Sequence, residues 1–139
     1  MTKKVLRFAP DLKFDLIAIT SPLRDYRLCH MLNTRLHFNF RKSDDYTLII
    51  ASNGHPTFFS RYADLWNSGD TEVFLLANKG GDGYLIPEMR SIDYFILIRG
   101  YLDAEDKQMV ISGLNRMDDI HAVLQVEPAR LRSHENLIF

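Results

Sequence analysis

The stretch GYLIPEMRSIDYFILIRG, residues 83–100, decides the fold, because it joins a glycine turn and a proline break to the most apolar run of the chain. Within it, apolar side chains occupy both alternating faces of residues 92–98. A strand that is apolar on both faces normally lies inside a sheet and is covered on both sides. We therefore predict a central strand over residues 92–98.

The composition is that of one domain with an ordinary core. A chain of 139 residues, 46% of them hydrophobic, fits a single domain, 1–139, that needs no disulfides for stability. Its formal net charge of −1 argues against a general electrostatic attraction to nucleic acid. The one cysteine suits a reducing compartment, and no apolar run reaches the ~18–20 residues that span a membrane. We expect a cytoplasmic protein with neither a membrane nor a nucleic-acid partner.

Periodicity and turn residues predict the remaining elements. One helix is expected over residues 21–37, where Ser21 and Pro22 form a favourable start, and a second over 103–117, with Asp103 as its N-cap. The other strands are predicted over 14–20, 46–52, 58–66, 71–78 and 120–126. The glycine-rich loop before residue 84 is read as a turn, because no helix follows it to receive a phosphate.

This order of elements is typical of an α+β fold. We predict a mainly antiparallel sheet of about five to six strands with two helices on one face. The order resembles a ferredoxin-like (split βαβ) fold with an extra hairpin. Residues 1–13 are predicted to form a short strand or a loose N-terminal arm, and residues 129–139 a C-terminal tail packed on the domain or on a partner.

Three separate segments carry a family resemblance. The sequence IPE at 86–88, followed after three residues by IDY at 92–94, resembles the signature of the IPExxxVDY family, small proteins of Bacteroidota, with isoleucine in place of valine. The segments DYRLC at 25–29 and ENLIF at 135–139 are also similar to that family. The resemblance spans nearly the whole chain. It implies kinship, and it assigns no activity, because the family is defined by its motif alone.

Glu88 and Asp93 are candidates for a general acid–base pair. They lie five residues apart across a turn, so their carboxylates could meet, and mutual repulsion would raise the pKa of one of them. Alternatively, Glu88 caps a turn or pairs with an arginine, while Asp93 accepts hydrogen bonds from loop amides. We favour this structural alternative, because no histidine or lysine is placed as a catalytic partner. Tyr94, next to Asp93, completes the candidate motif.

Asp25, Tyr26 and Arg27 place a charge pair and a phenol in the first turns of the predicted helix. Arg27 is suited to bind a carboxylate or phosphate in a pocket. The structural alternative has Asp25 favour the helix dipole and Tyr26 join the core. We favour a structural role for both motifs, in which Asp25 or Arg27 pairs with Glu88 or Arg90 and so ties the helix to the sheet.

Aromatic and apolar side chains form candidate interaction surfaces. Phe58, Tyr62 and Trp66 are predicted to share one strand face, either packed in a core or interface or stacked on RNA bases. The first reading is favoured, because basic residues are sparse around them. Three apolar residues close the C-terminal tail: Leu137, Ile138 and Phe139. They either pack on their own sheet, which we favour, or bind a partner as an extended peptide.

No metal or cofactor site is predicted. Cys29 lies on the apolar side of the first predicted helix, where a thiol is unreactive. The five histidines are not spaced as the ligands of a metal ion.

These patterns favour a non-catalytic cytoplasmic binding or adaptor protein that acts through protein–protein contacts. We expect an unknown protein partner, with a homodimer formed through an exposed strand edge or through the 58–66 hairpin as an open alternative. The rival hypothesis is a small-molecule sensor or a small enzyme that uses Arg27, Glu88 and Asp93. A weaker alternative is an RNA-associated factor, whose binding would depend strongly on salt.

Overall fold

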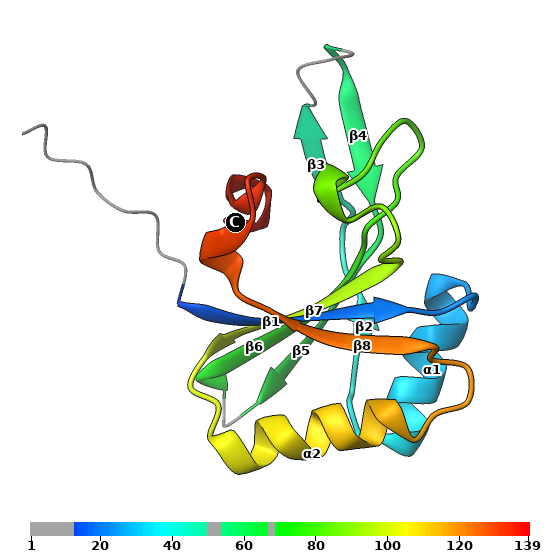
Figure 1. Ribbon diagram of the computed structural model, residues 1–139, viewed down its shortest axis with the longest axis vertical. Coiled ribbons are helices and arrows are strands. Elements are labelled where there is room, and N and C mark those ends of the chain that lie inside the picture. Colours follow the sequence, from blue (N-terminus) through cyan, green and yellow to red (C-terminus); the bar gives the residue numbers. More distant parts are fainter. Residues whose placement is uncertain (1–12, 50–53, 67–68) are drawn as a thin grey trace, which may run out of the picture.

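The computed structural model describes residues 13–49, 54–66 and 69–139, and it has an α+β architecture built on two antiparallel sheets (Figure 1). The six-stranded sheet has the order β2-β5-β6-β7-β1-β8, and β3 and β4 form a separate two-stranded sheet. The strands of the two sheets are β1 (Phe14–Thr20), β2 (Arg41–Lys42), β3 (Tyr46–Ile49), β4 (Pro56–Phe59), β5 (Arg61–Trp66), β6 (Thr71–Ala77), β7 (Tyr94–Gly100) and β8 (Ala122–Val126). The helices are α1 (Asp25–Arg35) and α2 (Ala104–Asn115). The prediction of a mainly antiparallel sheet with two helices is confirmed.

Strand β7 lies between β6 and β1, as its apolar sequence predicts. Ile96 pairs with Ile17 of β1 on one side and with Leu75 of β6 on the other. The side chains of β7 alternate between two cores, so that Ile96 points to one face of the sheet and Phe95 and Leu97 point to the opposite face. Both faces are buried, because each is covered by a further layer. The observed strand begins two residues later than predicted, at Tyr94.

Helices α1 and α2 cover one face of the sheet (Figure 1). Leu28 and Leu32 of α1 and Leu114 of α2 are fully buried against that face. The two helices approach closely at Gly113, where a Cβ atom would lie 2.4 Å from Cδ2 of Leu36. A side chain at this position would therefore require the Leu36 side chain to move.

The opposite face is covered by three irregular segments (Figure 1). The first is the β3–β4 hairpin, which contributes the fully buried Phe59. The second is the signature segment, with Leu85 and Ile86. The third is the C-terminal tail, with Leu131 and Leu137. The protein is thus a sheet between a regular helical layer and an irregular layer.

The first helix begins at Asp25, not at the predicted Ser21 and Pro22. Ser21 is buried, and its polar groups are already used: its amide donates to the Asp93 carboxylate (2.8 Å) and its hydroxyl to the Asp119 carbonyl (2.7 Å). Tyr26 lies in the first turn of this helix, and its side chain is 60% exposed. Its predicted place on the buried side of the helix was therefore wrong.

The predicted strand 58–66 is two strands with a break at Ser60. Before the break, β4 pairs with β3, and after it β5 joins the six-stranded sheet. The break places Phe58 on the hairpin and Tyr62 in the core under the helices, so the predicted shared face of Phe58, Tyr62 and Trp66 does not form. The predicted residues 50–52 of the preceding strand and 1–12 of the N-terminal arm lie outside the described part of the chain.

Candidate functional site

The signature segment is organised around Asn78, a fully buried side chain at the end of β6. Its amide nitrogen donates to the carbonyls of Met89 (2.9 Å) and Ile92 (2.8 Å). Its amide oxygen accepts from the amide of Ile86 (2.8 Å). All three partners are backbone groups of the IPExxxIDY segment. Asn78 therefore fixes the turn that carries the signature, which includes the short 3-10 turn Pro87–Met89.

Asp93 and Tyr94 tie the signature to the segment that leads into α1. The Asp93 carboxylate accepts from the Ser21 amide, as described above, and the Tyr94 hydroxyl donates to the Leu23 carbonyl (2.6 Å). Burial, followed by the negative charges of Asp25 and Asp93, raises the pKa of Tyr94 to about 12. The phenol therefore stays protonated at neutral pH and acts as a hydrogen-bond donor.

Asp25 ties the start of α1 to the break between β4 and β5. Its carboxylate accepts from the Ser60 hydroxyl (2.5 Å), from the Tyr62 hydroxyl (3.1 Å) and from the Tyr26 amide (2.9 Å). Burial alone would raise the pKa of Asp25, but these hydrogen bonds outweigh it and lower the pKa below its ordinary value of 3.8. Burial, followed by the charge of Asp25, raises the pKa of Tyr62 to about 12. Asp25 is thus an ionised acceptor.

Glu88 faces the C-terminal tail. Its carboxylate accepts from the Ser133 amide (2.8 Å), and the side chain of Asn136 donates to the Leu85 carbonyl (2.8 Å) in the same contact region. Burial raises the pKa of Glu88, but the hydrogen bonds around Ser133 dominate and lower it overall. The segments that carry the IPE and ENLIF motifs therefore meet in space, and each motif binds a backbone group next to the other motif.

The tail ends in an aromatic contact on the sheet. Phe139 lies edge-on to Phe74 (centroids 5.0 Å apart) and tilted against Tyr46 (4.8 Å). The guanidinium groups of Arg61 (5.4 Å) and Arg99 (5.2 Å) lie over its ring. The tail therefore packs on its own sheet, which is the alternative that the sequence favoured. Leu137 is buried and Ile138 remains exposed.

A cavity of about 740 Å³ lies beside the N-terminus of α1, and we term it the α1 cavity. It brings together four of the predicted site residues: Asp25, Tyr26, Asp93 and Tyr94. Its lining also contains two cations that the sequence reasoning missed, Arg24 and Lys79. The carboxylates of Asp25 and Asp93 accept hydrogen bonds from other segments of the protein. The side chains of both cations have no hydrogen bond or ion pair within the described residues.

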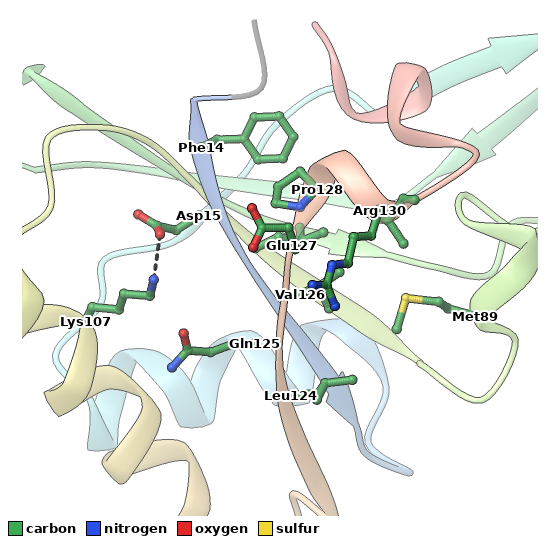
Figure 2. Close-up of a pocket in the computed structure, with 12 residues that line it drawn as sticks. Phe14, Asp15, Met89, Lys107, Leu124, Gln125, Val126, Glu127, Pro128 and Arg130 are labelled. Carbon is green, nitrogen blue, oxygen red and sulfur yellow. Dashed lines mark hydrogen bonds and ion pairs between the residues drawn. The ribbon is translucent and has the colours of Figure 1, made fainter. Parts of the chain in front are cut away.

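A second hollow, of about 640 Å³, lies around the end of β8 and the start of β1 (Figure 2). Leu124 and Gln125 point to opposite sides of the strand there. Asp15 and Lys107 form an ion pair of 2.8 Å on one side of the hollow, and Met89 and Arg130 line the other.

The predicted pairings between the two motifs are not formed. Asp25 bonds to Ser60 and Tyr62, and Glu88 to Ser133, so neither Asp25 nor Arg27 pairs with Glu88 or Arg90 among the described residues. Glu88 and Asp93 bind different segments and do not form an acid–base pair. The sequence predicted a tie between helix and sheet, but it chose the wrong partners, because Ser60 and Tyr62 lie 35 and 37 residues from Asp25.

Other features restrict what the site can hold. Within the described residues, no group of three or more His, Cys, Asp or Glu side chains is arranged to bind a metal ion. None of the described helices has the length and apolar character needed to cross a membrane.

Comparisons with protein-family models, with curated proteins and with solved structures find no match.

Proposed function

We propose that this chain is a non-catalytic cytoplasmic binding or adaptor protein that acts through protein–protein contacts. One observation carries the proposal: polar side chains from all three signature motifs bind partners inside the fold. Asp25, Glu88 and Asp93 accept hydrogen bonds that join separate segments, and Asn136 donates one. The pKa values of Asp25 and Glu88 are lowered, and such carboxylates are poorly placed for proton transfer, since a general acid or base needs a pKa near the operating pH.

The partner surface in this proposal is the outer face of the β3–β4 hairpin. Its strand register places Thr47 opposite Phe58 and Ile49 opposite Pro56, and all four side chains are exposed. Ile49 is 72% exposed and Phe58 is 57% exposed. Adjacent large apolar side chains on a surface mark sites of protein association. A partner with a complementary apolar patch would cover them.

The experiment is an affinity purification of the full chain from its native cell, in three forms. We expect the wild type to recover a stoichiometric protein partner, and Phe58→Ser to lose it without a change in melting temperature. Met109→Ser is the matched control, because Met109 is 66% exposed on α2, away from the hairpin. Equal recovery by all three forms, or recovery of no partner, would refute the hairpin as the binding surface.

The kinship and the fold type belong to the same proposal. Membership of the IPExxxVDY family is supported by hydrogen bonds that join one motif to residues next to another motif, since such contacts explain why the motifs occur together. A ferredoxin-like variant is supported by the strand order β8-β1-β7-β6 and by the positions of α1 and α2 between strands in the chain. In this description β2 to β5 are an insertion between α1 and β6.

A second candidate function, a small-molecule sensor, is favoured by the α1 cavity. Arg24 and Lys79 would bind a small anion there, in place of the Arg27 and Glu88 suggested by the sequence. The probe is inorganic phosphate in a thermal-shift assay. A rise in melting temperature that is retained in Arg27→Ala and lost in Arg24→Ala/Lys79→Ala would support a sensor, because Arg27 is a neighbouring exposed cation outside the cavity lining. An unchanged melting temperature would argue against it.

A further inference from the structure

The two edges of the six-stranded sheet differ in how they are protected. The β2 edge consists of two residues, both basic, Arg41 and Lys42. Short length and positive charge are common means by which proteins prevent an edge from pairing with another chain. The β8 edge is five residues long and reads AVLQV, with no charge, proline or glycine. It therefore lacks these means of protection.

Strand β8 is the last strand of the six-stranded sheet. It pairs with β1 on one side and with no other described strand. Leu124, at the middle of the strand, is 52% exposed. An unpaired edge can accept one more strand, which would lie about 4.8 Å away.

The β8 sequence is complementary to itself. If a second β8 pairs antiparallel and is centred on Leu124, Ala122 faces Val126 and Val123 faces Gln125 of the second copy, and the two Leu124 side chains meet. No charged residue is placed inside this pairing. A self-complementary patch of this kind gives a closed twofold dimer.

Two polar residues that flank β8 fit the same arrangement. In the Leu124-centred register, His121 of one copy faces Glu127 of the other, and both lie next to the strand. Both residues are exposed, and their side chains form no hydrogen bond or ion pair within the described ranges. An imidazole N–H can donate to a facing carboxylate, and the pair would occur twice in a twofold dimer.

We propose that a second copy of this chain pairs antiparallel with β8, in the register centred on Leu124, and that the two six-stranded sheets become continuous. Main-chain hydrogen bonds supply the affinity in such strand addition, and the side chains set the register. The proposal concerns self-association and is independent of any partner at the β3–β4 hairpin.

The first test measures the mass of the full chain by sedimentation equilibrium over a series of concentrations. We expect reversible conversion to twice the monomer mass. Leu124→Lys should raise the dimer dissociation constant at least tenfold, because two lysines would face each other. Leu65→Lys is the matched control, since Leu65 is 65% exposed on β5. A monomer at every concentration, or a dimer unaffected by Leu124→Lys, would overturn the proposal.

The second test addresses the register. Glu127→Arg should weaken the dimer, because His121 would lose the facing carboxylate that accepts its hydrogen bond. The double variant His121→Glu/Glu127→Arg should restore the dimer, because it places a carboxylate opposite a guanidinium. Hydrogen exchange of the wild type, measured at high and low concentration, should show β8 amides that are protected only in the dimer. This measurement does not depend on the folding of any variant. Failure of the double variant to recover, or concentration-independent exchange in β8, would contradict the assigned pairing.

Discussion

The two faces of the central sheet are covered by different means. On one face, α1 and α2 supply a continuous apolar layer through ordinary helical periodicity. On the other face, a hairpin, a turn and a tail meet, and hydrogen bonds made by the side chains of Asn78, Glu88 and Asn136 hold the turn and the tail in place. Regular elements satisfy their own backbone groups, whereas irregular segments need side chains to do so. The irregular face should therefore depend more strongly on a few polar residues.

The largest effect is expected for Asn78→Ala. The change leaves three buried backbone groups without their partner, and we expect the free energy of unfolding to fall by roughly 3–5 kcal/mol. Denaturant unfolding measures it. Asn33→Ala is the matched control on the helical face, where the half-buried Asn33 side chain bonds to the backbone of Phe40 and donates to the Cys29 sulfur (3.7 Å). A loss of roughly 1–2 kcal/mol is expected there, and equal losses would contradict the comparison.

Truncation of one buried leucine on each face should separate local from global effects. Leu137→Ala and Leu32→Ala each remove a buried side chain and should cost about 2–4 kcal/mol. The difference should appear in hydrogen exchange. Leu137→Ala should release protection mainly in residues 131–139, because the tail is held by few contacts, whereas Leu32→Ala should lower protection across the sheet. A uniform loss of protection in both variants would show that the tail is not a separate unit.

Asp25 on the helical face and Glu88 on the opposite face both have a lowered pKa. The direction of these shifts determines how the stability of the protein depends on pH. The pKa values of Asp25 and Glu88 lie below their ordinary values of 3.8 and 4.5 in the folded protein. Their contribution to stability is therefore present above those ordinary values and is lost as the pH falls through the folded pKa.

The charge-neutral variants test this dependence. Asp25→Asn and Glu88→Gln should each lower the free energy of unfolding by about 1–2 kcal/mol at pH 7 and flatten its decline in acid. Thermal melts between pH 7 and pH 3 provide the measurement. A decline in acid as steep as that of the wild type would contradict the assigned role of the carboxylate.

The smallest effect, of opposite sign, is expected for Thr57→Val. The Thr57 hydroxyl is buried under the hairpin and has no hydrogen-bond partner among the described residues. Replacing it with a methyl group removes an unsatisfied polar atom and should raise the free energy of unfolding by about 1 kcal/mol. A loss of stability in a urea titration would indicate that the hydroxyl has a favourable environment.

The sequence predicted those elements whose structure is set by nearby residues. Strand β7 follows from its alternating apolar residues, and the N-cap of α2 follows from Asp103, whose carboxylate accepts from the Asp106 amide (2.8 Å). The start of α1 could not be predicted in this way. Ser21 is a favourable cap residue, but partners 72 and 98 residues away occupy its amide and its hydroxyl.

The candidate site was predicted only in part for the same reason. The sequence placed Asp25 and Asp93 in structural roles but could not name their partners. Lys79 and Arg24 were missed, because nothing in their local sequence indicates that they line a common cavity. Asn78 follows an apolar strand and precedes a glycine loop, and this position is a usable signal for a side chain that closes a turn.

The position of Cys29 has a practical consequence. This thiol, the only one in the chain, lies beneath α1, with its sulfur 3.7 Å from the Phe40 carbonyl. Burial, followed by the charge of Asp25, raises its pKa, although the Asn33 amide acts in the opposite direction. We therefore expect a thiol reagent to react slowly with it in the folded protein, and faster when α1 moves away from the sheet. The rate of its alkylation in the native protein reports how often the helical layer opens, without any introduced label.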